Sequence, residues 1–121
     1  MNLLNKYFLP IGTLFVLSLL FFLHKYGMMN YWYVYYPYLD IINHILGGIG
    51  IAMSLLFILK NPKYIIPLTF IAGIAWEFFE VYYDISGYHF GTLLYNIDTI
   101  KDLLNDTLGS VIVWLIYQYK K

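Results

Sequence analysis

The chain has 121 residues, of which 61% are hydrophobic and 12% charged, and its formal net charge is zero with histidine neutral. About 25% of the residues of a soluble domain are charged, and a soluble fold of this size could not bury so much apolar surface. The zero net charge indicates no nucleic-acid partner, and the absence of cysteine excludes disulfides and thiolate metal sites. We therefore expect one membrane domain over residues 1–121, because apolar side chains can face lipid.

The hydrophobic runs predict an all-α, polytopic membrane protein, a bundle of four transmembrane helices. The first helix is predicted at 7–24, and it is interpreted as retained because no small-residue cleavage site follows it. The aromatic stretch 28–38 predicts a segment at the membrane–water interface, where Tyr and Trp are favoured. In chain order the remaining elements are helix 38–60, a polar turn at 60–63, helix 64–84, a loop at 85–97 and helix 97–119.

The lysines predict the orientation of the helices, since all seven basic residues are lysine. With four spans, both termini and the 60–63 turn share one side of the membrane. Lys25 and Lys101 lie on the other side. The positive-inside rule then predicts that both termini are cytoplasmic and that the protein crosses the cell (plasma) membrane several times. The lysines of the cytoplasmic side are Lys6, Lys60, Lys63, Lys120 and Lys121.

All seven carboxylates gather at the outer ends of the last three predicted helices. Within each group the acids, with His44, are spaced three or four residues apart, so each group lies on one helical face. Glycines continue these polar faces toward the membrane centre, which favours faces that turn toward one another. The sequence therefore predicts one cluster in the outer half of the membrane, made of Asp40, His44, Glu77, Glu80, Asp84, Asp98, Asp102 and Asp106.

Converging carboxylates in a low-dielectric site cannot all stay ionised without a partner. Lys25 and Lys101 are too few to neutralise them. Hard divalent cations prefer oxygen ligands, and helical bundles with Asp, Glu and His at this spacing are a known way to hold them. We therefore predict that the eight residues of the cluster are ligands of a divalent metal ion, which is Mg²⁺, Mn²⁺, Ca²⁺ or Fe²⁺.

An alternative interpretation applies to Asp40, Asp84 and Asp98, which are solvated helix ends if they lie at the interface, with Asp98 as an N-cap. His24 and His89 are interpreted as interfacial residues. In the same interpretation Asp102 is favoured near the first turn by the helix dipole. Glu77, Glu80 and Asp106 lie deeper, where an unpaired carboxylate is expensive. The residues predicted to act catalytically are His44, Glu77, Glu80 and Asp106.

Two motifs, W-E-F-F-E at 76–80 and D-x3-D-x2-N-D-x-L-G at 98–109, carry a resemblance. The chain resembles the YjdF-like inner-membrane proteins and, more distantly, the VanZ-like membrane proteins. The resemblance covers about residues 40–110 and implies an integral membrane protein without implying a particular chemistry. It falls on Asp40, His44, Gly47, Trp76, Glu77, Glu80, Asp98, Asp102, Asp106 and Gly109.

Three functions fit these patterns. The first is a metal-dependent enzyme that hydrolyses or transfers a phosphoester on the head group of a membrane lipid, with iron-dependent oxidation as a second chemistry on the same ligands. His44 or a carboxylate would serve as general base, and Lys25 and Lys101 would offer charge to the phosphate. The second is a divalent-cation transporter, for which a homo-oligomer would supply the missing polar path. The third is an accessory structural protein.

Overall fold

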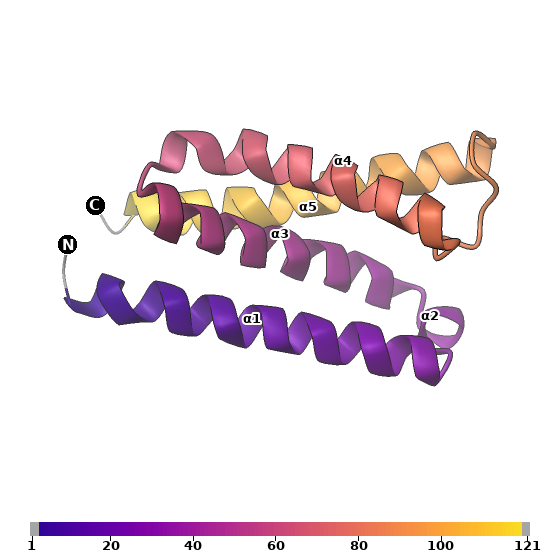
Figure 1. Ribbon diagram of the computed structural model, residues 1–121, viewed down its shortest axis with the longest axis horizontal. Coiled ribbons are helices and arrows are strands. Elements are labelled where there is room, and N and C mark those ends of the chain that lie inside the picture. Colours follow the sequence, from indigo (N-terminus) through magenta and orange to yellow (C-terminus); the bar gives the residue numbers. More distant parts are fainter. Residues whose placement is uncertain (1–2, 120–121) are drawn as a thin grey trace.

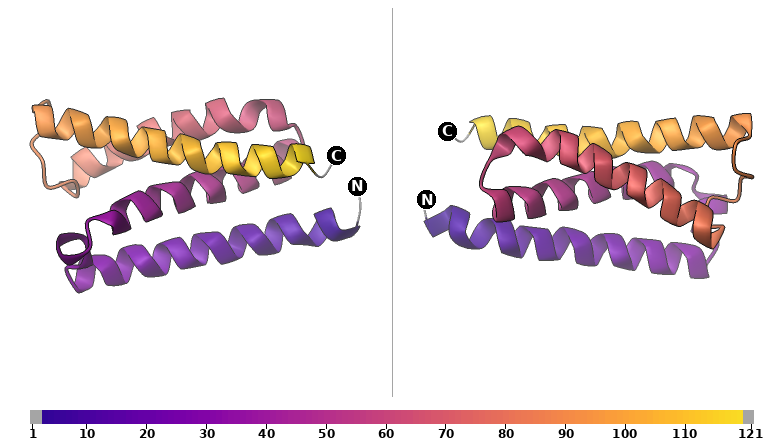
Figure 2. Two further views of the ribbon diagram at one scale, coloured as in Figure 1. Left: turned by 180° about the vertical axis from the view of Figure 1, so that it is seen from behind. Right: turned by 45° about the horizontal axis from the view of Figure 1, so that its top comes forward.

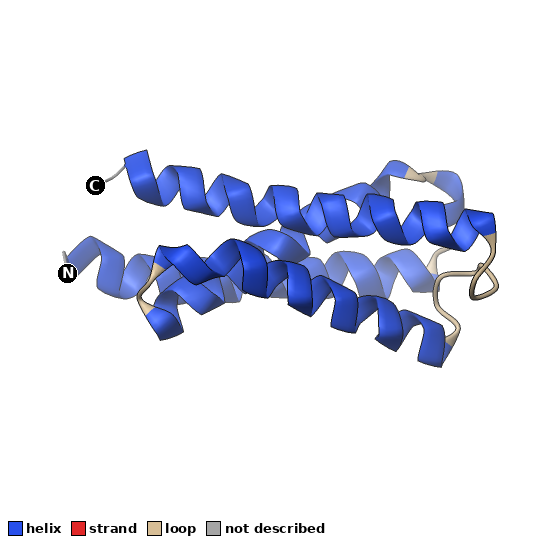
Figure 3. Cartoon of the chain, turned by 90° about the horizontal axis from the view of Figure 1, so that it is seen from above, coloured by secondary structure: helices blue, strands red, loops and turns tan. Residues whose placement is uncertain are grey.

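The structure, a computed structural model, describes residues 3–119, and four long helices lie side by side along its longest axis (Figure 1). The part of the chain that it describes contains helices and short loops and no strand (Figure 3), so the prediction of an all-α fold is confirmed. The first long helix begins and the last one ends at the same end of the bundle. The elements are α1 (Leu3–Met29), α2 (Trp32–Tyr35), α3 (Tyr38–Leu59), the 3₁₀ turn η1 (Pro62–Tyr64), α4 (Ile65–Tyr83) and α5 (Leu93–Tyr119).

Three helical segments are long and apolar enough to cross a membrane, namely Tyr7–Met29, Tyr38–Leu59 and Pro62–Tyr83. Large apolar side chains such as Phe15, which is 69% exposed, cover their outer surfaces. In a bilayer such side chains would face lipid. The fourth crossing, by α5, and the cytoplasmic termini stay predictions, and Lys120 and Lys121 lie outside the described residues.

Three helix boundaries differ from those predicted. The first helix begins at Leu3, before the predicted residue 7. The first helix runs past residue 24 to Met29, because a charged interfacial stretch does not by itself stop a helix; Tyr31 then adopts the left-handed conformation, with φ 57°. The last helix begins at Leu93, since the Thr92 hydroxyl accepts the backbone N–H of Tyr95 at 3.3 Å and caps it. The loop is therefore 84–92, and Asp98 lies inside the helix rather than at its N-cap.

A glycine contact joins α3 to α5, the most closely packed pair of helices. A Cβ atom placed on Gly48 would lie 2.0 Å from the carbonyl oxygen of Asp106, and one on Gly109 would lie 2.3 Å from that of Ile45. The two backbones therefore touch at this level. Toward the end of the bundle where α1 begins and α5 ends, the contact continues into an apolar core, formed by Ala52, Met53, Leu56, Ile65 and Val113.

Candidate metal centre

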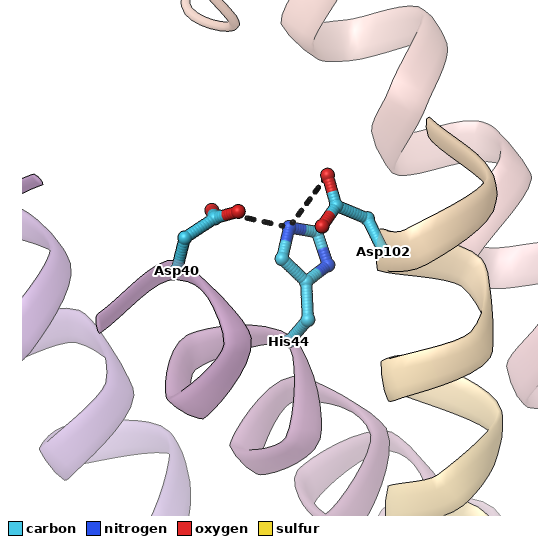
Figure 4. Close-up of side chains that lie close together, drawn as sticks. All are labelled: Asp40, His44 and Asp102. Atoms are coloured by element: carbon cyan, nitrogen blue, oxygen red, sulfur yellow. Dashed lines mark ion pairs between the residues drawn. The ribbon is translucent and has the colours of Figure 1, made fainter. Parts of the chain in front are cut away.

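His44 lies at the centre of the acidic cluster, one turn from the Gly48 contact on α3, and is 7% exposed. Its Nε2 atom is 3.7 Å from Oδ1 of Asp40 and 3.6 Å from Oδ2 of Asp102. Figure 4 shows the two carboxylates flanking this nitrogen from α3 and from α5. One ligand atom from each of the three residues lies within 4.8 Å of the others, which is a spacing that a single cation can bridge.

The other ring nitrogen of His44 faces a third carboxylate. Its Nδ1 atom is 3.3 Å from Oδ1 of Asp106 on α5. When Nδ1 carries the proton and donates a hydrogen bond to Asp106, Nε2 presents a lone pair toward Asp40 and Asp102. Histidines that bind metals usually donate their second nitrogen to a carboxylate in this way, which fixes the tautomer and the ring orientation. Asp106 therefore has the position of an orienting residue rather than of a ligand.

A second oxygen of Asp106 has no hydrogen-bond partner although it is buried. This Oδ2 atom points at α4, where a Cβ atom on Gly73 would lie 2.7 Å from it. Only glycine at residue 73 leaves room for the carboxylate in its present position. The predicted continuation of the polar faces into glycine is thus a feature of the site, because Gly73 accommodates an acidic side chain of another helix.

One lysine, Lys101, is shared among three aspartates of the cluster. The Nζ atom of Lys101 lies 2.8 Å from Oδ2 of Asp40 and 2.7 Å from Oδ1 of Asp98, and it is 3.5 Å from Oδ1 of Asp102. Lys25, the other lysine predicted at this end, is exposed, with Nζ 5.9 Å from the centre of the Phe21 ring. Lys101 therefore offsets only part of the negative charge of the cluster.

The acids of α4 separate from one another. Glu80 is 8% exposed, lines the main cavity, and its Oε1 accepts the Trp76 indole N–H at 2.8 Å. Glu77 is also buried, but its Oε2 accepts the Thr99 hydroxyl at 2.9 Å and it lines a separate cavity of about 190 Å³. Asp84 is exposed and ends α4 in the left-handed conformation, with φ 52°. The structure therefore does not bring Glu77 or Asp84 to His44, since the helical period that would align Asp84 stops at Tyr83.

A cavity of about 750 Å³ connects the cluster to the space between the helices. Side chains and backbone of α1, α3, α4 and α5 all line it. Such a volume lies in the range typical of small-molecule sites, about 300–1,000 Å³. The titratable residues of α3, α4 and α5 that line it are Asp40, His44, Glu80, Asp98, Lys101 and Asp106.

The sequence did not indicate a network of three residues beside this cavity. His24 is half-buried in the cavity wall, and its Nδ1 lies 3.0 Å from the Tyr33 hydroxyl. The side-chain amide of Asn43 donates a hydrogen bond to the same hydroxyl. Burial raises the pKa of Tyr33 to about 12, so its hydroxyl keeps a proton to donate to His24. Asn43 could have been suspected from its place beside His44. His24 could not, because the cavity wall on α1 is otherwise apolar.

The chain matches one family of known sequences over nearly its full length. The family described as "Predicted membrane protein (DUF2238)" matches residues 2–121. No curated protein matches the chain, and no solved structure does. The match agrees with the three apolar spans, and it gives the cluster around His44 no activity.

Proposed function

We propose that this chain, which belongs to the DUF2238 family of predicted membrane proteins, holds a divalent metal ion at Asp40, His44 and Asp102 and uses it in phosphoester hydrolysis or transfer on a lipid head group. The setting of His44 carries the proposal, because one ring nitrogen faces two carboxylates while the other faces a third. Two carboxylates and one imidazole suit Mg²⁺, Mn²⁺, Ca²⁺ or Fe²⁺ better than a structural zinc ion.

Charge supports the same proposal. Four aspartates surround His44 and Lys101. Among the residues that the structure describes, the ammonium of Lys101 is their one cationic partner when His44 is neutral. Buried carboxylates without a positive partner are strongly unfavourable. Asp102 is 1% exposed, and its Oδ1 atom, like Oδ2 of Asp106, has no hydrogen-bond partner. A divalent cation would offset two of the unbalanced charges at the point where they are most deeply buried.

Three residues around the site have separate roles in the proposed reaction. A bound divalent ion supplies Lewis acidity and lowers the pKa of a coordinated water. Glu80 faces the cavity from α4, held at Oε1 by Trp76, and we assign it as the general base. Lys101 offers positive charge to a phosphate, and Asp106 holds the His44 ring in place.

The setting in a membrane completes the proposal. With 27 residues, α5 is about 40 Å long, enough to cross a hydrocarbon core of about 30 Å. Its buried acids Asp102 and Asp106 turn toward α3 and away from lipid. We therefore include α5 as the fourth span of a plasma-membrane protein whose termini are cytoplasmic and whose site opens outward.

Divalent-cation transport receives less support from the packing. The apolar core lies inward of the cavity on α3, α4 and α5, and Ala52 and Ile65 within it are 0% exposed. An ion that left the cavity inward would have to cross this layer without polar ligands, which is costly. Flux through proteoliposomes that disappears in Asp106→Asn would favour transport instead.

The direct test is elemental analysis of the detergent-purified protein, followed by an assay on vesicles of phosphatidylglycerol and phosphatidic acid. We expect close to one equivalent of a divalent metal per chain, and release of head group or phosphate that stops after chelation and returns with Mn²⁺. A protein that binds no divalent ion when titrated with Mn²⁺ would contradict the metal site. Undiminished turnover in chelator would contradict the metal-dependent reaction.

Replacing Lys101 separates a metal site from a purely structural cluster. In Lys101→Met, Asp40 and Asp102 lose a competing cation, so we expect the Kd for Mn²⁺ to fall about tenfold, which is about 1.4 kcal/mol. Calorimetric titration would measure it, with Lys25→Met as the control because Lys25 lies away from the cluster. If the acids only tie helices together, Lys101→Met will lower thermal stability and leave Mn²⁺ binding absent.

A further inference from the structure

One wall of the cavity is apolar. On α1 it is lined by Leu17, Leu20 and Phe21, and on α4 by Ala72 and Ala75. These side chains offer neither charge nor hydrogen bonds. The cavity is therefore amphipathic. Three aspartates, His44 and Lys101 on α3 and α5, with Glu80 near the end of α4, form its charged part, and hydrocarbon side chains of α1 and α4 form the rest.

The two helices of the apolar wall are poorly joined to each other. The first helix lies along one edge of the bundle and packs on α3 (Figure 2), whereas α4 packs on α5 and α3. The ring of His24 on α1 contacts the ring of Trp76 on α4 edge to face, with the ring centroids 6.1 Å apart. Leu20 on α1 and Ala72 on α4 both line the cavity, and the small side chain of Ala72 fills little of the space between these two helices.

The level of this opening decides what can enter it. Leu17 to Phe21 lie roughly 12–18 Å inward from Met29, the outer end of α1, at 1.5 Å per residue. In the proposed topology that depth is inside the hydrocarbon core of the bilayer. A water-soluble phosphoester would not reach the opening, whereas a lipid diffusing in the outer leaflet would meet it with its chain.

We propose that the cavity takes a phosphate-bearing membrane lipid sideways, with one hydrocarbon chain passing between α1 and α4 and the phosphate resting against Lys101 and the Asp40–His44–Asp102 cluster. The chemistry at the phosphate rests on the proposed function, while the route of the chain rests on the cavity alone. The substrate class is accordingly a lipid phosphoester, because a soluble phosphoester that entered from the outer end would leave the apolar wall uncovered. His24 and Trp76 bridge the opening on its outer side, at the border between chain and head group.

The test uses the full chain in nanodiscs of phosphatidylcholine that contain phosphatidic acid with a diazirine in its acyl chain. After photolysis, peptide mass spectrometry locates the labelled residues. We expect several-fold more label on Leu17 and Leu20, which line the cavity and are 39% exposed and half-buried respectively, than on Phe15, a lipid-facing residue of the same helix that is 69% exposed. Equal labelling of Phe15 and the cavity residues would overturn the proposal, and so would cleavage of glycerol phosphate as fast as of phosphatidic acid.

A matched pair of variants fills the cavity or spares it. Ala72→Phe places a ring in the opening, and Ile71→Phe places it on the neighbouring surface, where Ile71 is 59% exposed. We expect Ala72→Phe to lower the labelling of the α1 wall several-fold and Ile71→Phe to leave it unchanged. If Ala72→Phe does not fold, Leu20→Trp fills the cavity from α1, with the exposed neighbour Leu19→Trp as its control.

Metal content separates the two proposals. If Ala72→Phe keeps its bound Mn²⁺ and loses the chain label, the lateral route stands. Unchanged label in both filled variants overturns the route and leaves the metal site intact. Label that depends on Ala72 in a protein without metal affinity supports the route and removes the proposed function. Crosslinks from the cavity to a second copy of the chain in place of lipid would overturn the lipid as occupant.

Discussion

Asp102→Asn will weaken the binding of Mn²⁺ by about 100-fold or more and will abolish turnover on lipid vesicles. The reason is the position of the carboxylate, which is 1% exposed and lies 3.6 Å from His44 Nε2 on the side opposite Asp40. Asparagine keeps the shape of the side chain and removes the charge, so a change in binding reports the ligand and not the packing. Loss of an orienting residue alone typically costs 10–100-fold in metal affinity, and loss of a ligand should exceed that.

Substitutions of two further aspartates provide Mn²⁺ affinities with which that of Asp102→Asn can be compared. Asp106→Asn removes the charge that faces His44 Nδ1, so we expect an intermediate loss of affinity, about 10–100-fold. Asp84→Asn is the matched control, because Asp84 is an exposed acid at the same end of the bundle and takes no part in the cluster. Calorimetric titration with Mn²⁺ measures all three variants. Equal affinity in the Asp102 and Asp84 variants would show that the metal, if any, binds elsewhere.

Much of this site was predictable because it is built from helical repeats. Asp40 with His44, and Asp102 with Asp106, are each four residues apart, and each pair lies on one face of its helix as expected. The limits of α3 and α4 were also close to those predicted, since Asn61 and Pro62 interrupt the hydrophobic pattern clearly. Local sequence thus predicted which acids share a helix face.

The relative rotation of the helices could not be read from the sequence. Residues three apart point about 60° away from each other around a helix, so Glu77 and Glu80 border different neighbours. Glu80 lines the main cavity, whereas Glu77 meets Thr99 on α5. The bridge from Lys101 on α5 to Asp40 on α3 depends on the same rotation. These contacts are set by the packing of α3, α4 and α5 and not by any single helix.

The packing of α3 on α5 depends on glycine at residue 48. Gly48→Ala should prevent α3 and α5 from approaching, because the new Cβ would lie 2.0 Å from the Asp106 carbonyl oxygen and 2.8 Å from its carbonyl carbon. Backbone atoms cannot rotate away as a side chain can. We therefore expect the free energy of unfolding to fall by more than the 1–3 kcal/mol that is typical of overpacking. Thermal unfolding and the monodisperse yield after detergent extraction measure the effect.

The neighbouring glycine is the control for this prediction. A Cβ on Gly47 would meet Oδ1 of Asp106 at 3.6 Å and Leu20 at 3.8 Å, which are ordinary van der Waals distances. Alanine is also favoured over glycine inside a helix by about 1 kcal/mol, so Gly47→Ala should be as stable as the wild type or more stable. If the two alanine variants unfold alike, the backbone contact at Gly48 does not hold α3 against α5. Another contact would then hold Asp102 and Asp106 of α5 beside His44.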